Sequence, residues 1–158
     1  GCQTGAPPIS LKNNKTVSPA TPHESTDEGD INNNNNHYND DNNNPILVEI
    51  FSSQGCKTST EAELLISRLG RGDFNLSRPI IILGFHVDYW DYLGWKDPFG
   101  SNQWTVRQKA YVDVLKLDTM FTPFVVVQGR AHCVGNDEDV VVDLVRVAPN
   151  FPSPNLQV

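Results

Sequence analysis

The sequence changes its pattern at Cys56, and this change constrains the fold more than any other feature. Residues 46–51 form a short apolar run with a single charge, which is typical of a buried strand. The run breaks at Gly55, and beyond Cys56 apolar residues recur with the spacing of one helical face, at Ala62, Leu65, Ile66 and Leu69. The unpaired N–H groups and the dipole at a helix N-terminus favour a thiolate over a thiol. The sequence therefore predicts a strand, a tight turn and a helix, with a reactive cysteine at the junction.

Further strands and helices follow along the chain. Residues 80–88 are apolar enough to predict a strand buried on both faces, set parallel to the first strand by a right-handed crossover. An aromatic loop is expected at 89–100, a helix at 101–117, a hairpin of residues 124–128 and 131–134, and a last helix after Asn136 or Asp137. The apolar faces of these two helices are expected at Trp104, Tyr111, Val114 and Leu115, and at Val140, Val141, Leu144, Val145 and Ala148. The order β-α-β-α-β-β-α predicts an α/β fold, with a mixed sheet flanked by helices.

Residues 1–45 differ in composition from the rest of the chain. Asn fills nine of the thirteen positions from 32 to 44, and large apolar residues are almost absent from the whole segment. Such a segment buries too little apolar surface to offset the entropy lost on ordering. We therefore expect a disordered leader over residues 1–45 and one folded domain over residues 46–150. Cys2 lies in this leader and is interpreted as an incidental exposed thiol.

Composition also limits the partners that this chain is expected to have. The net charge is −7, of which the leader carries −4, and no cluster of basic residues predicts a nucleic-acid surface. No apolar run approaches the ~20 residues that span a bilayer, so no membrane partner is expected. Three cysteines at wide spacing argue against a disulfide framework and favour a reducing compartment, which predicts a cytoplasmic location.

Several motifs together resemble a known family. Thr122-Pro123 stands just before the third predicted strand, and its place relative to Cys56 resembles the thioredoxin fold. Residues 53–56 (Ser-Gln-Gly-Cys), 85–98, 107–111 and 121–130 are similar to a thioredoxin-like family of unknown function with bacterial and plant members. The stretches 116–123 and 133–137 resemble the plant branch of that family. The resemblance implies a thioredoxin-like domain, a cis Thr122–Pro123 bond beside the thiol, and a truncated further segment that starts at residues 151–158.

One departure from the family pattern bears on the chemistry. Family members carry C-x-x-C followed by Pro, whereas this chain has Ser59 and Thr60 at those positions. The expected activity is therefore monothiol exchange, in which Cys56 attacks a disulfide sulfur and an external thiol resolves the mixed disulfide. Ser59 would donate a hydrogen bond to the thiolate, and glutathione is expected as a co-substrate rather than as a bound cofactor. The alternative is a non-enzymatic module on a thioredoxin scaffold that has lost dithiol activity and binds a peptide or small ligand.

Other residues are expected around this thiol. Pro123 is expected at the catalytic site, and Thr122, His86, Asp88 and Trp90 are expected to contact a thiol- or disulfide-bearing protein or small molecule. His86 either tunes the thiolate or is satisfied by Asp88 or the backbone in a structural loop. No metal site is expected, because no second His lies at ligand spacing. Cys133 is interpreted as a small apolar filler, since its predicted edge strand lies too far from the first strand for a disulfide with Cys56.

Overall fold

The structure, a computed structural model, describes residues 2–3 and 44–151. From Ile46 onward, the observed order agrees with the predicted β-α-β-α-β-β-α, apart from one 3-10 helix and one two-residue strand. The elements are β1 (Cys2–Gln3), β2 (Ile46–Ser52), α1 (Ser59–Arg71), β3 (Ile80–His86), the 3-10 helix η2 (Asp91–Leu93), α2 (Asn102–Val114), β4 (Phe121–Thr122), β5 (Phe124–Val127), β6 (Ala131–Val134) and α3 (Glu138–Arg146).

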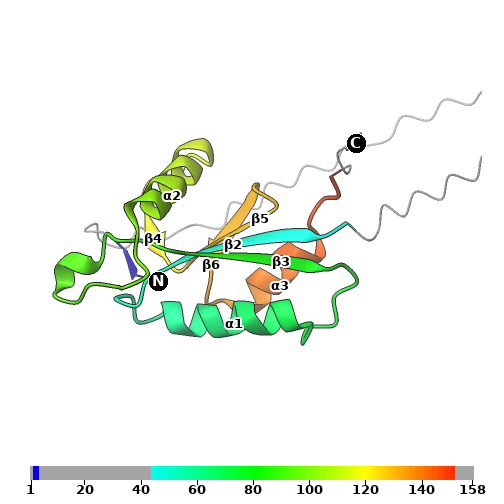
Figure 1. The fold of residues 1–158 in the computed structure, drawn as a ribbon. Helices are drawn as coiled ribbons and strands as arrows, with labels where there is room; N and C mark the ends of the chain where they lie inside the picture. Colours follow the sequence, from blue (N-terminus) through cyan, green and yellow to red (C-terminus); the bar gives the residue numbers. More distant parts are fainter. Residues whose placement is uncertain (1, 4–43, 152–158) are drawn as a thin grey trace, which may run out of the picture. The chain divides into compact units, whose positions relative to one another are not determined.

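Four strands form one mixed sheet in the order β3-β2-β5-β6. β2 pairs in parallel with β3 and antiparallel with β5, and β5 pairs antiparallel with β6. The helices α1 and α3 lie on one face of this sheet, and α2 lies on the other (Figure 1). The prediction of an α/β fold with a mixed sheet flanked by helices is therefore confirmed. Because β2 is an inner strand, its carboxyl end lies between the carboxyl end of β3 and the amino end of β5, and the Cys56 turn follows from this end.

Alternation along β2 produces a core on each side of the sheet. Ile46, Val48 and Ile50 are buried among apolar residues of α1 and α3. Phe51 points to the opposite face, where Cys56 and Trp90 belong to the same buried cluster. Successive residues of a strand face opposite sides of the sheet, so this alternation follows from the backbone. Cys56 is therefore part of the core on the α2 side.

The structure corrects the prediction that β3 is buried on both faces. β3 is an edge strand, and the side chains of Ile81 and Leu83 are 48% and 40% exposed. α2 contacts β3 near Phe85, whose ring lies 4.8 Å from that of Trp104, and leaves these two residues uncovered. An apolar run alone does not distinguish an inner strand from an edge strand.

The apolar faces predicted for the last two helices are partly wrong. Val114 and Val140 are exposed, whereas Gln108, Val112 and Val142 are buried. Gln108 is buried because its amide makes two hydrogen bonds: Nε2 donates to the carbonyl of Phe121 at 2.7 Å, and Oε1 accepts from the Tyr89 hydroxyl at 3.0 Å. A polar residue outside the predicted apolar face is therefore buried. The face predicted for α1 is confirmed, since all four of its apolar residues are buried.

The leader is described only at its two ends. Cys2 and Gln3 form β1, which pairs antiparallel with β4, so the prediction of disorder is wrong for these two residues. The prediction of disorder rested on the lack of apolar residues in the segment. That argument ignores any covalent bond that holds a single residue in place. Most of the predicted leader, residues 4–43, and most of the predicted further segment, residues 152–158, lie outside the described residues. Within the described parts of the chain, no helix has the length and apolar character needed to cross a membrane.

Cys133 is a free cysteine of β6, and its prediction as a core filler is confirmed. Its side chain is buried, and it packs in the cluster that faces α1 and α3. Burial raises the pKa of the thiol to about 12, and the nearby Asp137 carboxylate acts in the same direction. The thiolate is therefore almost absent from the folded protein at neutral pH.

Iodoacetamide at pH 8 should leave Cys133 almost unmodified in the folded protein and alkylate it readily in denaturant. A thiol with a pKa of about 12 is ionised at about one part in ten thousand at this pH, whereas an ordinary thiol is ionised at roughly a quarter. Peptide mass spectrometry after timed quenching measures both rates. Equal rates in the folded and denatured chain would show that this strand opens freely to solvent.

Candidate functional site

Cys56 lies in the turn that connects β2 to α1. Its backbone N–H donates to the carbonyl of Ser53 at 3.0 Å, and its carbonyl accepts from the N–H of Ser59 at 3.1 Å. The sulfur lies 3.5 Å from the hydroxyl of Thr58 and 3.4 Å from the carbonyl oxygen of Thr122. The side chain is 1% exposed. The turn therefore fixes the sulfur at the N-terminal end of α1, between a hydroxyl donor and a carbonyl.

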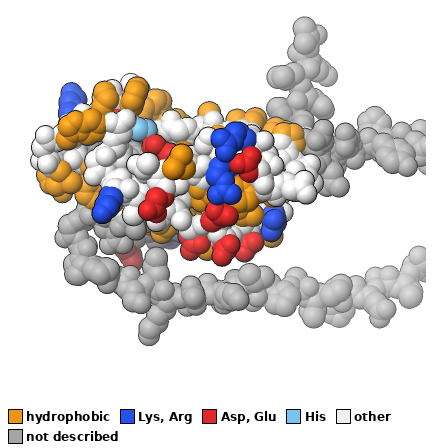
Figure 2. Space-filling view, turned by 90° about the horizontal axis from the view of Figure 1, so that it is seen from below, with side chains coloured by type: hydrophobic (Ala, Val, Ile, Leu, Met, Phe, Trp, Pro, Cys, Tyr) orange, Lys and Arg blue, Asp and Glu red, His pale blue; other side chains and the backbone are white. Residues whose placement is uncertain are grey.

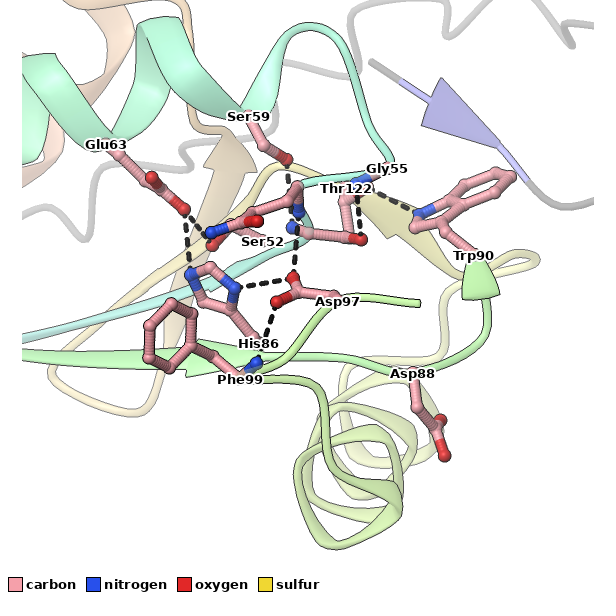
Figure 3. A network of polar contacts seen from close by, with 12 residues as sticks. Ser52, Gly55, Ser59, Glu63, His86, Asp88, Trp90, Asp97, Phe99 and Thr122 are labelled. Carbon is pink, nitrogen blue, oxygen red and sulfur yellow. Dashed lines mark hydrogen bonds and ion pairs between the residues drawn. The ribbon is translucent and has the colours of Figure 1, made fainter. Parts of the chain in front are cut away.

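The Thr122–Pro123 bond is cis, as predicted. The Thr122 hydroxyl accepts a 2.8 Å hydrogen bond from the indole N–H of Trp90, and both side chains are buried (Figure 3). Behind Pro123, the N–H of Gly135 donates to the proline carbonyl at 3.0 Å, and a Cβ at position 135 would lie 3.1 Å from the proline Cβ. Thr122 and Trp90, two of the residues expected around the thiol, are thus brought to Cys56.

Cys2 forms a disulfide with Cys56, and the Cα atoms of the two residues are 5.9 Å apart. Two expectations are therefore wrong: Cys2 is not an incidental free thiol, and Cys56 does not lack a neighbouring sulfur. Position 59 carries no thiol, but Cys2, which is 54 positions from Cys56 in the sequence, supplies a second sulfur. Spacing arguments consider cysteines within one motif, so they gave no signal for this pair.

Ser59 has a different role from the one expected. Its buried hydroxyl accepts the backbone N–H of Ser53 at 3.2 Å, which closes the turn around Cys56. The hydroxyl beside the sulfur belongs to Thr58, and it lies 3.8 Å from the Cys2 sulfur as well. No sequence pattern indicated this contact, because the distance of the Thr58 hydroxyl from the sulfur depends on the conformation of the turn.

His86 lies between two carboxylates. Its Nδ1 is 2.6 Å from Asp97 Oδ2, and its Nε2 is 3.0 Å from Glu63 Oε1, which also accepts the Ser52 hydroxyl at 2.6 Å (Figure 3). The ring thus joins α1 to the loop after β3. His86 is linked to the Cys56 turn through Asp97. This supports the interpretation of His86 as a structural residue, but its partners are Asp97 and Glu63 and not Asp88.

Asp88, the expected partner of His86, points away from this network (Figure 3). Its carboxylate accepts the hydroxyl of Thr105 at 2.6 Å, and its backbone N–H donates to the same hydroxyl at 3.1 Å. Asp88 therefore anchors the first turns of α2 to the end of β3. The structure does not bring it to the sulfur.

Asp97 is a further residue of this site that sequence reasoning missed. Its buried carboxylate accepts the N–H groups of Gln54 and Phe99, each at 2.9 Å, in addition to the His86 ring. Burial alone would raise the pKa of Asp97, but the hydrogen bonds from Gln54, Phe99 and His86 outweigh it, so the pKa is lowered. Asp97 thereby ties the Cys56 turn to the loop after β3. The only sequence signal was its place in the block of residues 85–98.

Two further features surround the site. Ser52, Glu63 and His86 line an open hollow of about 360 Å³, together with Ile50, Gly84, Phe99 and Trp104. Tyr92, Leu93, Trp95 and Phe99 are more than half exposed. Hydrophobic side chains gather at the end of the molecule where η2 lies, at the left in Figure 1 and in Figure 2. Across residues 2–3 and 44–151, no three His, Cys, Asp or Glu side chains are arranged to hold a metal ion.

Comparisons with known proteins place the chain in a family. One similar structure is an X-ray crystal structure of a protein from Agrobacterium tumefaciens, determined as a structural genomics target. It is 37% identical in sequence, with a TM-score of 0.55, and the match covers 63% of this chain and 43% of that protein. This chain thus spans less than half the length of that protein. No curated protein matches the sequence. Residues 47–158 match the family described as "Protein of unknown function (DUF1223)", and the chain therefore belongs to this family.

Proposed function

We propose that this chain is a thioredoxin-like thiol–disulfide exchange protein in which Cys56 is the nucleophile. The observation that carries the proposal is the position of the Cys56 sulfur, at the carboxyl end of an inner strand and the N-terminal end of α1. There it lies between the Thr58 hydroxyl and the Thr122 carbonyl, 3.5 and 3.4 Å away. Open α/β sheets place their sites at the carboxyl ends of strands, which supports the assignment.

The chemistry follows from this position. When Cys56 is reduced, its thiolate attacks one sulfur of a substrate disulfide, forms a mixed disulfide and releases the other sulfur as a thiolate. The Thr58 hydroxyl is placed to donate a hydrogen bond to the Cys56 thiolate, and the N-terminus of α1 favours the negative charge. The substrate class is a disulfide-bearing protein or small molecule. Glutathione fits as a co-substrate, and no bound cofactor is required.

Asp97 and Trp90 position the reacting groups rather than react. Asp97 holds the N–H of Gln54 two residues before the nucleophile, and Trp90 holds the hydroxyl of Thr122, whose carbonyl contacts the sulfur. These contacts fix the sulfur and the carbonyl relative to each other. Catalytic groups of this kind act well only when neighbouring residues hold their geometry.

The proposal predicts that the reduced chain exchanges disulfides through Cys56. After reduction and removal of the reductant, we expect wild type to reduce a fluorogenic glutathione disulfide, and Cys56→Ser to lose at least about 90% of this initial rate, since the thiolate is the nucleophile. Cys133→Ser is the matched control, because Cys133 is buried on the other face of the sheet, and it should retain the wild-type rate. Full activity in Cys56→Ser would remove Cys56 from the mechanism.

A binding module is the second candidate function, and the exposed hydrophobic residues of the η2 region favour it. Tyr92, Leu93 and Trp95 are 73%, 60% and 52% exposed, which is unusual for large hydrophobic side chains gathered at one end of a domain. In this case the region beside Cys56 binds a peptide or small ligand without redox chemistry. The exchange assay separates the two candidates, because a binding module would show the same low rate in wild type and in Cys56→Ser.

A further inference from the structure

We infer that Cys2 is the resolving cysteine of this site and that the β1 strand delivers it to Cys56. The inference rests on the proposed function, and it replaces the external thiol of a monothiol mechanism with one from the same chain. Its starting point is the disulfide between Cys2 and Cys56, which joins residues 54 positions apart. A resolving thiol must be able to reach the sulfur that carries the mixed disulfide. In the structure, Cys2 is already bonded to that sulfur, the sulfur of Cys56.

Backbone pairing explains how Cys2 finds Cys56. β1 pairs antiparallel with β4, and in this register Cys2 lies opposite Thr122 and Gln3 opposite Phe121. Thr122 is also the residue whose carbonyl oxygen lies 3.4 Å from the Cys56 sulfur. One residue of β4 therefore contacts the nucleophile through its carbonyl and faces Cys2 through the strand pairing. The addition of an extended segment to a strand edge is a common mode of peptide binding.

The environments of the two sulfurs assign a role to each. Cys56 is 1% exposed in the disulfide state, whereas Cys2 is only partly buried, and the Thr58 hydroxyl lies within 3.8 Å of both sulfurs. A substrate disulfide can reach Cys56 only when the β1 strand is away from β4. Two paired residues make few hydrogen bonds, so this strand can dissociate without unfolding the domain. The structure thus corresponds to the closed, oxidised state of the cycle.

The complete cycle balances. With β1 away from β4, the Cys56 thiolate attacks a substrate disulfide, forms a mixed disulfide and releases one substrate thiolate. The β1 strand then pairs with β4, and the Cys2 thiolate attacks the Cys56 sulfur, forms the Cys2–Cys56 bond and releases the second substrate thiolate. The substrate gains two electrons, and the protein dithiol loses them. A dithiol reductant resets the site by attacking the more exposed sulfur, Cys2, which releases Cys56 as a thiolate; its second thiol then frees Cys2.

Reaction of the reduced chain with oxidised glutathione tests the inference. Samples are quenched with acid and alkylated, and intact-mass and peptide mass spectrometry follow the mixed disulfide. Wild type and the Cys133→Ser control should pass through a short-lived glutathione adduct on Cys56 to the Cys2–Cys56 disulfide. In Cys2→Ser the adduct should persist about a hundredfold longer at about 10 µM external thiol, because a thiol on the same chain acts at an effective concentration of about 1 mM.

A register variant tests the role of the strand. Cys2→Ser combined with Gln3→Cys keeps the number of thiols but moves the second thiol by one residue, so that it is paired with Phe121 and not with Thr122 in the β1–β4 register. Its adduct should live as long as that of Cys2→Ser. A wild-type lifetime in this variant would overturn delivery by the strand. An adduct equally long-lived in wild type and Cys2→Ser would overturn the role of Cys2 but leave Cys56 as the nucleophile. If no adduct forms on Cys56 in Cys2→Ser, the proposed function fails as well.

Discussion

Reduction of the Cys2–Cys56 disulfide should lower the free energy of unfolding by about 4 kcal/mol. The bond joins residues 54 positions apart, and in the chain-entropy account closing a loop of this length restricts the unfolded chain by about that amount. This value applies when β1 stays paired with β4 in most reduced folded molecules and leaves it only transiently. For a domain of this size the melting temperature should fall by about 15 °C. Thermal unfolding followed by circular dichroism, with and without a phosphine reductant, measures the difference.

Cys2→Ser is the control for this experiment. It should melt at the temperature of reduced wild type and should not respond to the reductant. Because folding and disulfide formation share one thermodynamic cycle, the same difference would make the reduction potential of the folded pair about 85 mV lower than that of the unfolded pair, at about 30 mV per 1.4 kcal/mol. An unchanged melting temperature after complete reduction, verified by mass spectrometry, would show that β1 does not hold to β4.

Asp97→Asn should have the second-largest effect on stability, a loss of about 3 kcal/mol. The buried carboxylate accepts hydrogen bonds from Gln54, Phe99 and His86, whereas an amide offers one oxygen and turns two donors toward groups that already donate. Each hydrogen bond to a charged group contributes about 1.5–3 kcal/mol, and a buried donor left unsatisfied costs about 1–3 kcal/mol. Urea unfolding at pH 7 measures the loss. Asp113→Asn, an exposed aspartate of α2, is the matched control and should change stability by less than about 0.5 kcal/mol.

The difference in stability between wild type and Asp97→Asn should depend on pH with a definite sign. The folded-state pKa of Asp97 is lowered from its ordinary value of 3.8, so the ionised carboxylate stabilises the folded state. This stabilisation is fully present above the unfolded-state pKa and is lost as the pH falls through the folded-state pKa. The difference between wild type and Asp97→Asn should therefore be constant above about pH 5 and shrink below about pH 4. A difference that grows in acid would contradict a lowered pKa.

Local patterns explain which parts of the fold were predictable from the sequence. The strand, turn and helix around Cys56 depend on residues within about 25 positions, and hydrophobic periodicity describes such segments well. The parallel pairing of β2 and β3 follows from the handedness of a crossover. The exposure of Ile81 and Leu83 was not predictable, because it depends on how far α2 extends across the sheet. Gln108 was not predictable for a similar reason, since its two partners lie in other elements.

The candidate site divides in the same way. Cys56, Thr122 and the cis bond to Pro123 followed from motifs, and the structure brings Trp90 to them. Asp97 depends on the closure of the loop after β3, which no periodic pattern encodes. The place of Cys2 in the site depends on a disulfide with a residue far away in the sequence. The residues around Cys2 indicated only that this segment buries little apolar surface. The composition of a segment indicates how much apolar surface the segment can bury. It does not indicate which covalent bond a single side chain forms.

The Cys2–Cys56 bond also changes the covalent topology of the molecule. It closes a ring of chain from residue 2 to residue 56, and every peptide bond between residues 4 and 43 belongs to that ring. A protease that cuts once inside the ring does not divide the oxidised molecule, because the two pieces remain joined through sulfur. The same cut in the reduced molecule releases the piece that carries Cys2 from the domain. Whether the chain survives a single cleavage as one covalent molecule is thus decided by the redox state of one pair of sulfurs.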